Sequence, residues 1–295
     1  MRCYLVALFA LAFVACADGA TPALTRLMEA RRITAELRVA FTNAADAANR
    51  AVMADTDETS TQFANEARQA SQTVQRGLDL LEPLVRGLSF REETQLLAQF
   101  RATFAKYQRL DAEVLSLAVE NTNLKAQRLS FGPAREAADQ LEEALEPLVR
   151  KSLAHGDSGL RTAEAASAQV FALSAVLAVR KLEALEAPHI AEPDDAAMTR
   201  LEQQMAAQIA EARAALDQLG SVKDSQIHAI VPAALAALAR FNAVHDQIVK
   251  LSRRNSNVRS LALSLGEKRK LTSVCEANLR ELSDQLAART YPATR

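Results

Sequence analysis

One stretch of this 295-residue sequence occurs twice. The segment ENTNLKAQRLSFG is followed later by RRNSNVRSLALSLG. Asn121 matches Asn255 at a separation of 255 − 121 = 134 residues, and Asn123 matches Asn257 at the same separation. An internal repeat of this kind indicates that one folding unit is present in two copies. Any fold expected for the first copy must therefore account for the second.

The repeat extends upstream and divides the chain into halves. Leu78 matches Leu216 at a slightly different separation, 216 − 78 = 138 residues. Between the halves, the run HGDSG at residues 155–159 is the most turn-like segment of the interior. The sequence therefore predicts a tandem duplication with an N-terminal segment at 1–20, a first domain at 21–154 and a second domain at 155–295.

Few residues in either half would break a helix. The chain has only eight Gly and eight Pro, and it is rich in the good helix formers Ala, Leu, Glu, Gln and Arg. Apolar residues recur at spacings of three and four, as in Phe63, Ala67, Ala70 and Val74, which is typical of a helix that buries one face. We therefore predict an all-α fold made of two tandem up-down four-helix bundles.

Helix caps and breakers predict where the helices begin and end. Ser89, with Glu92 three residues later, has the form of a capping box and predicts the start of the third helix. Pro193 followed by Asp194 and Asp195 predicts a helix start in the second half, because acids suit the positive end of a helix. The expected helix ends are the run ADTDETS at 54–60, Gly87 and Gly220.

The repeated segment leaves two places where the third helix of each half could end. One is Gly132-Pro133, because the apolar pattern runs on evenly to that point. The other is Asn121, since Asn adopts the left-handed conformation that ends a helix and Thr122 can cap the next one. We favour Asn121, because all helices then have about 30 residues and a length of about 45 Å. On this interpretation the motif is a hairpin corner used twice, and Gly132-Pro133 is a kink in the fourth helix.

The N-terminal segment has the layout of a bacterial secretory signal. A positive residue, Arg2, precedes an apolar run from Leu5 to Ala15, which is too short to span a bilayer. The residues up to Cys16 resemble a lipobox, although Phe13 stands where Leu is usual. Cys16 is therefore either lipidated or removed by cleavage after Ala17. Both alternatives predict a periplasmic protein whose only membrane attachment would be an N-terminal lipid.

The rest of the sequence offers little catalytic or metal-binding chemistry. None of His155, His189, His228 and His245 lies three or four residues from another His or Cys. Gly-rich phosphate loops and a nucleophile elbow are absent, and a net charge of −1 argues against nucleic acid as a partner. We expect no enzyme activity, no catalytic residue, no metal and no cofactor. Cys275 is expected to be a buried small residue rather than an intermolecular bridge or a nucleophile.

Two groups of polar residues have both a binding and a structural interpretation. The asparagine corners could line a ligand pocket, but Asn, Ser and Thr are also what a corner requires. The pairs Arg31-Arg32 and Arg253-Arg254 could receive a carboxylate ligand. Adjacent residues on a helix point about 100° apart, so only one of each pair can face a given groove. We favour structural corners and solvated helix faces.

The third helix of the first half carries a recognisable pattern. It reads LLAQFRATFAKYQRLDAEVLSLAVENTN, with an aromatic residue at Tyr107 and the acids Asp111 and Glu113. The half-chain thereby resembles the periplasmic four-helix-bundle ligand-binding domain of methyl-accepting chemotaxis receptors and related sensor kinases. The second copy, ALARFNAVHDQIVKLSRRNSN, is weaker because His245 and Gln247 replace the acids.

This resemblance implies a function but names no ligand residue. Domains of that family bind small solutes at a dimer interface or between helices, so it implies a small-molecule ligand and a homodimer. The receptors continue into a second membrane span, which this sequence does not show, so we expect any signal to pass by protein contact. The expected function is an exported, non-enzymatic, sensor-like protein that binds a small molecule or an envelope protein. The alternative is an envelope lipoprotein that acts as a spacer or scaffold.

Overall fold

The computed structural model describes residues 17–151 and 159–290, and all regular secondary structure in these ranges is helical. The predicted all-α fold is confirmed. Two other predictions lie outside the described residues: the signal segment up to Cys16, and the HGDSG run except for its last residue.

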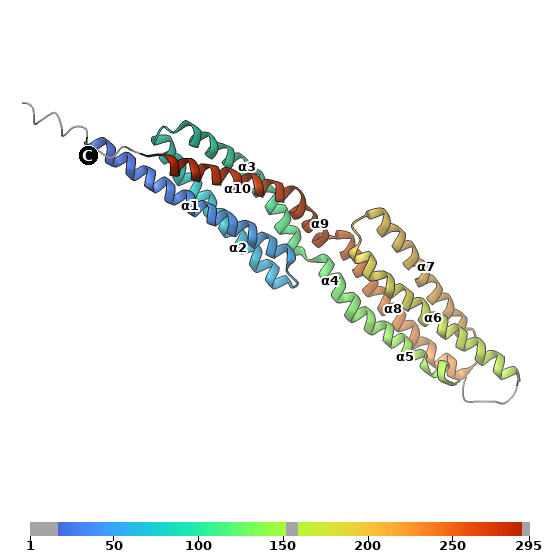
Figure 1. Cartoon of the computed structure of the whole chain (residues 1–295). Coiled ribbons are helices and arrows are strands. Elements are labelled where there is room, and N and C mark those ends of the chain that lie inside the picture. Colours follow the sequence, from blue (N-terminus) through green and yellow to red (C-terminus); the bar gives the residue numbers. More distant parts are fainter. Residues whose placement is uncertain (1–16, 152–158, 291–295) are drawn as a thin grey trace, which may run out of the picture. The chain divides into compact units, whose positions relative to one another are not determined.

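Figure 1 shows the order of the helices along the chain. In chain order they are α1 (Ala17–Met53), α2 (Asp57–Gly87), α3 (Arg91–Glu120), α4 (Thr122–Leu129), the π-helical turn η1 (Ser130–Ala134), α5 (Arg135–Lys151), α6 (Gly159–Ala191), α7 (Asp195–Gly220), α8 (Ser225–Arg254), α9 (Ser256–Leu263), the π-helical turn η2 (Ser264–Lys268) and α10 (Arg269–Ala288).

The first compact unit takes the described residues up to Val119 and from Ser260 onward. Its core is built by α1, α2, α3 and α10. The Phe41 ring of α1 lies edge-on to Phe100 and Phe104 of α3, with 6.0 Å between ring centroids in both cases. Edge-to-face contacts of this kind add to the stabilisation from burial. Helix α10 completes the core with Cys275, Leu279, Leu282 and Leu286, all at most 1% exposed.

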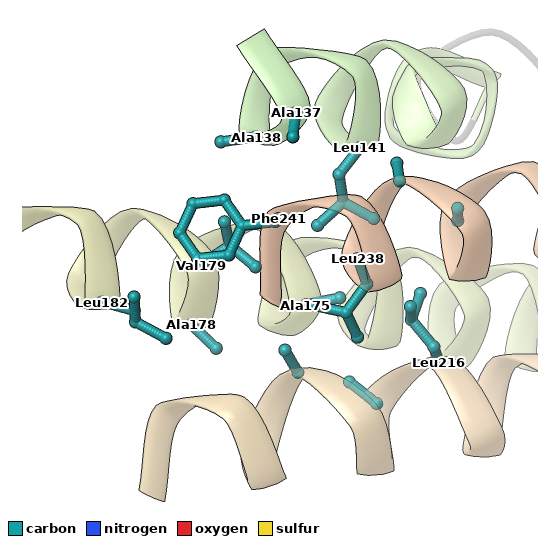
Figure 2. Close-up of a cluster of buried hydrophobic side chains, with 14 of the residues drawn as sticks. Ala137, Ala138, Leu141, Ala175, Ala178, Val179, Leu182, Leu216, Leu238 and Phe241 are labelled. Carbon is teal, nitrogen blue, oxygen red and sulfur yellow. The ribbon is translucent and has the colours of Figure 1, made fainter. Parts of the chain in front are cut away.

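The second compact unit takes residues 120–259. Its core is built by the α4–η1–α5 segment together with α6, α7 and α8. Alanines predominate where these helices face each other, which lets their backbones approach closely, and the larger Phe241 fills the space between them (Figure 2). The labelled core residues are Ala137, Ala138, Leu141, Ala175, Ala178, Val179, Leu182, Leu216, Leu238 and Phe241.

Each unit combines three helices from one half of the sequence with the fourth helix from the other half. Helix α10, from the second half, packs against α1, and α5, from the first half, packs against α8 (Figure 1). The two compact units therefore do not have the expected boundaries 21–154 and 155–295. The bundles are interleaved along the chain rather than consecutive.

The length of the corner explains this exchange. Only Asn121 lies between the last residue of α3 and the first residue of α4. A hairpin between antiparallel helices needs a connection of about two to five residues. A single non-helical residue is too short for that, so the fourth helix does not return onto α3. The predicted hairpin is wrong, although the predicted break at Asn121 is confirmed.

Backbone angles show why the break falls at the asparagines. Asn121 has φ 49° and ψ 38°, and Asn255 has φ 52° and ψ 37°. Both are left-handed, a conformation that Asn tolerates better than most residues. Gly132-Pro133 lies within η1, so the predicted kink is accommodated as one π-helical turn. Gly266 lies in the corresponding turn, η2.

The predicted helix ends are mostly correct. Helices α1, α2 and α7 end at Met53, Gly87 and Gly220, and Asp194 caps α7 by accepting a hydrogen bond of 2.7 Å from the Ala197 N–H. The predicted capping box at Ser89 is wrong. Ser89 has φ 58°, whereas an N-cap residue is normally extended. It belongs to the turn that follows α2, and α3 begins two residues later.

Candidate functional site

The two repeated corners bind each other within the second unit. The Thr122 N–H donates to the Ser256 hydroxyl, and the Ser256 N–H donates to the Thr122 hydroxyl, both at 3.0 Å. The Asn123 N–H donates to the Asn257 Oδ1, and the Asn257 N–H donates to the Asn123 Oδ1, both at 3.1 Å. Each corner therefore caps the helix that follows the other corner.

Two asparagine amides also tie the corners to the end of α6. Asn123 Nδ2 donates to the Ile190 carbonyl at 2.6 Å and to Asn255 Oδ1 at 2.7 Å. Asn255 Nδ2 donates to the Glu192 carbonyl at 2.8 Å. The last carbonyls of a helix have no partner within it, so the bond to Ile190 satisfies a group that α6 leaves open. Glu192 is the residue that directly follows α6. The structural interpretation of the corners accounts for these polar groups without a ligand.

We expect the reciprocal caps to contribute measurably to stability. Replacing the fully buried Ser256 by Ala leaves the Thr122 N–H without its acceptor, and an unpaired buried donor costs about 1–3 kcal/mol. Urea denaturation of S256A should show this loss in the free energy of unfolding. Ser273→Ala, at an exposed position on α10, is the matched control. Equal stability of the two variants would contradict the role of the caps.

A carboxylate is buried in the core of the second unit. Glu186 on α6 is fully buried, and its two oxygens have different partners. The Ser130 hydroxyl, in the π-helical turn η1, donates to Oε2 at 2.5 Å, and His245 Nδ1 lies 3.0 Å from Oε1. The His245 ring is stacked on Phe241, with 6.3 Å between centroids. The site is a closed polar layer that joins η1, α6 and α8.

A second polar group lies one helical turn along α6. His189 Nδ1 is 2.7 Å from the Ser252 hydroxyl, and Nε2 is 2.9 Å from Glu202 Oε1. Arg253 binds both oxygens of Glu202, at 2.5 and 2.8 Å, and this hydrogen bonding lowers the pKa of that carboxyl. Arg253 was a candidate for binding a carboxylate ligand. Its guanidinium group instead binds a carboxylate of the same chain, that of Glu202.

His189 should make the free energy of unfolding decrease as the pH falls. Burial lowers the pKa of its imidazole below the ordinary value of about 6.5. Below that pH the unfolded chain binds a proton more readily than the folded one, so stability falls from about pH 6.5 down to the folded-state pKa. Each tenfold difference in proton affinity is worth about 1.4 kcal/mol.

Denaturation curves between pH 7 and pH 5 would measure this effect. His189→Gln, which cannot take up the proton, should show a shallower decline of stability than the parent protein. His228→Gln serves as the matched control, because His228 is exposed. An unchanged decline in His189→Gln would contradict the assignment.

The first unit has a different buried pair at its own π-helical turn. Lys268 at the end of η2 is 2% exposed, Asp111 on α3 is 3% exposed, and Nζ lies 2.7 Å from Oδ1. The contact is a buried ion pair. Burial raises the pKa of Asp111, while Lys268 opposes that effect. Close by, the Ser264 hydroxyl donates to Asn49 at 3.1 Å, as Ser130 does to Glu186 in the second unit.

The other arginines of the candidate pairs also have internal partners. Arg31 donates to the Leu286 carbonyl at 2.9 Å and to the Arg289 carbonyl at 2.7 Å, at the end of α10. Arg32 pairs with neighbouring glutamates on its own helix. Arg254 binds both oxygens of Glu120 at 2.6 Å. The expectation of merely solvated faces is thus wrong for Arg31 and Arg253, which anchor other elements.

The remaining candidate residues have structural roles or no visible role. Cys275 is buried as predicted, and burial raises the pKa of its thiol to about 12. His228 is exposed, and His155 lies outside the described residues. Within residues 17–151 and 159–290, no group of His, Cys, Asp and Glu is arranged to hold a metal ion.

Two described stretches are long and apolar enough to cross a membrane: Glu164–Ala191 and Ser225–Ala288. Both supply core side chains, such as Leu182 from the first and Leu238 from the second. The buried core helices of a soluble protein can have the same length and composition. Any membrane attachment therefore stays a prediction from the N-terminal segment.

Open cavities lie between neighbouring helices of the first unit. One of about 600 Å³ lies between α1 and α2, and one of about 330 Å³ lies between α2 and α3. A smaller one, of about 220 Å³, lies between α1 and α10. We call this the α1/α10 cavity. Its lining residues are Arg38, Phe41, Thr42, Glu276, Leu279 and Arg280.

Known proteins resemble this chain only weakly. No family model and no curated protein matches the sequence. Among solved structures, the chain is similar to the TorS sensor domain in its complex with TorT in the presence of TMAO. The identity is 14%, the match covers 88% of this chain and 99% of that chain, and the TM-score is 0.47. At that level the likeness does not establish a family, and the chain's own residues have to carry the function.

Proposed function

We propose that this protein is an exported, non-enzymatic, sensor-like binding protein that takes a small molecule or an envelope partner on its helical units. The α1/α10 cavity supports this proposal best. Its charged and hydroxyl-bearing lining groups are Arg38, Thr42, Glu276 and Arg280, and they form no ion pair within the described part of the chain. The charged groups of the polar clusters described above are, by contrast, paired internally.

The buried acid and histidines do not favour catalysis. Glu186, His189 and His245 are each at most 4% exposed, and their partners are side chains of the same unit. None of them lines the cavities described above. A general acid or base has to reach the proton that it transfers, so these groups suit a structural layer better than a reaction.

Export and duplication belong to the same proposal. The apolar run before Cys16 supports secretion, with a lipid anchor if that thiol is acylated. A tandem duplication is supported by left-handed asparagines at 121 and 255 and by π-helical turns that begin at Ser130 and Ser264, both 134 residues apart. A homodimer stays a prediction.

A thermal unfolding screen against small solutes tests the binding function. A ligand present at 100 times its dissociation constant should stabilise the protein by about 2.7 kcal/mol. Zwitterions, organic acids and amines should be included, because the α1/α10 cavity carries both signs of charge. A uniformly flat response would favour the alternative, an envelope scaffold.

A further inference from the structure

The internal repeat allows the two units to be compared position by position. The offset of 138 that aligns Leu78 with Leu216 also holds for α1 and α6. It pairs Phe41 with Val179 (179 − 41 = 138), and Leu37 with Ala175 (175 − 37 = 138), and all four are core residues. The offset of 134 aligns the fourth helices, as it does the corners. Equivalent positions can therefore be read directly for the residues that line the α1/α10 cavity.

In the second unit, an arginine side chain occupies the position that corresponds to the α1/α10 cavity. Thr42 corresponds to Arg180 (180 − 42 = 138), and Glu276 corresponds to Glu142 (276 − 142 = 134). Arg180 Nη2 lies 2.6 Å from Glu142 and 2.6 Å from Asp139, and Nη1 lies 2.9 Å from Glu183. The second unit thus binds its own guanidinium where the first unit, with the shorter Thr42, has a cavity.

The first unit also adds positive charge around this cavity. Arg38 stands where the second unit has Val176 (176 − 38 = 138), and Arg280 stands where it has Glu146 (280 − 146 = 134). Arg38 Nη1 has one long contact, 3.5 Å to the Ser283 hydroxyl. Within the described residues, Arg280 and Glu276 have neither a hydrogen bond nor an ion pair. Two guanidinium groups and one carboxylate are therefore available to a ligand.

We propose that the α1/α10 cavity binds a small zwitterion that carries a guanidinium or ammonium group and a carboxylate. This assignment rests on the binding function proposed above and names its site. The cationic group lies against Glu276, as the Arg180 guanidinium lies against Glu142. The carboxylate lies between Arg38 and Arg280, because a guanidinium matches a carboxylate in shape and charge. Buried Phe41 and Leu279 form the floor.

The size of the cavity limits the ligand. Its volume is about 220 Å³, the smallest of the three cavities described above. A compact solute in which one or two carbons separate the two charged groups fits this space. A longer chain would have to extend into solvent.

Titration calorimetry of the full mature chain with guanidinoacetate tests the proposal. We expect saturable binding of guanidinoacetate and at least tenfold weaker binding of acetate and of methylguanidinium, since each carries only one of the two charges. The decisive variant is Thr42→Arg, which introduces the residue of the second unit. It should abolish binding while the unfolding temperature is retained, because the second unit accommodates arginine at this position against the equivalent glutamate.

Two further variants keep the test independent of folding. Thr61→Arg, at an exposed position on α2 outside the cavity, should bind guanidinoacetate like the parent protein. Arg280→Glu also introduces the residue of the second unit. This variant should bind guanidinoacetate at least tenfold more weakly than the parent protein does. It should bind methylguanidinium at least as tightly as the parent protein.

Two results would overturn the assignment: no saturable binding of guanidinoacetate, or binding that Thr42→Arg leaves unchanged. If another solute from the thermal screen stabilised the protein in either case, the binding function would stand and only this site and ligand class would fail. If the whole screen were also flat, both would fail.

Discussion

A chain cut between residues 151 and 159 is expected to stay associated under native conditions and to lose both units when the fragments are separated. The N-terminal fragment holds α1, α2 and α3 of the first unit, but α10 is on the other fragment. The core then lacks Leu279, Leu282 and Leu286, which are at most 1% exposed. At about 1.5–3 kcal/mol for each buried leucine, the loss is about 5–9 kcal/mol, which approaches the whole stability of a typical domain.

A protease site placed at residues 152–158 makes this measurable. After cleavage, the fragments should elute together in size-exclusion chromatography and retain the helical circular dichroism of the intact chain. After separation in urea and refolding, neither alone should give a cooperative transition as a monomer, and mixing should restore one. The uncleaved protein with the same insertion is the control. A stable, fully helical monomer from either fragment alone would contradict the exchange of the fourth helices.

Asp111→Ala is expected to cost about 3–5 kcal/mol, because it leaves the ammonium group of Lys268 buried without its counter-charge. Replacing both partners, as Asp111→Leu with Lys268→Met, should recover most of that loss. Apolar side chains of similar volume remove the need to bury any charge, and such replacements are often neutral or stabilising.

Urea denaturation of the single and double variants would check this expectation. Glu113→Ala, two residues along α3 at an exposed position, is the matched control and should change the stability by less than about 0.5 kcal/mol. If Asp111→Ala behaved like Glu113→Ala, the ion pair would contribute nothing to the folded state. A double variant less stable than Asp111→Ala would show instead that the charges support the packing around η2.

The sequence predicted the helices well because their ends depend on local chemistry. Asp194 caps α7 from the adjacent turn, and Asn121 takes the left-handed conformation within its own segment. Ser89 shows the limit of such reasoning. Its spacing from Glu92 matched a capping box, but the turn that ends α2 required a left-handed residue at the same place. The same residue matched both a capping box and a left-handed turn, and in the structure it forms the turn.

The apolar pattern of each fourth helix did not predict which three helices it packs against. A stripe shows which face of a helix is buried but not which helices bury it, and both halves offer similar faces. The informative signal was the length of the corner, since one residue is too short for a hairpin. The α1/α10 cavity could not be predicted from the pattern of a single helix either. It depends on side chains from α1 and α10, far apart in the sequence, and only the replacement of Arg180 by Thr42 in the aligned repeats could have indicated it.

The interleaved order of the helices has a consequence for synthesis. Everything that the second unit needs has been translated once residue 259 has been made, whereas the first unit needs α10 as well. At about 5–20 residues per second, the ribosome takes about 10–30 s to pass from the end of α3 to the end of α10. During that interval the apolar residues of α1, α2 and α3 that form one core with α10 lack the side chains which that helix supplies. The first unit to begin emerging is the last that can close.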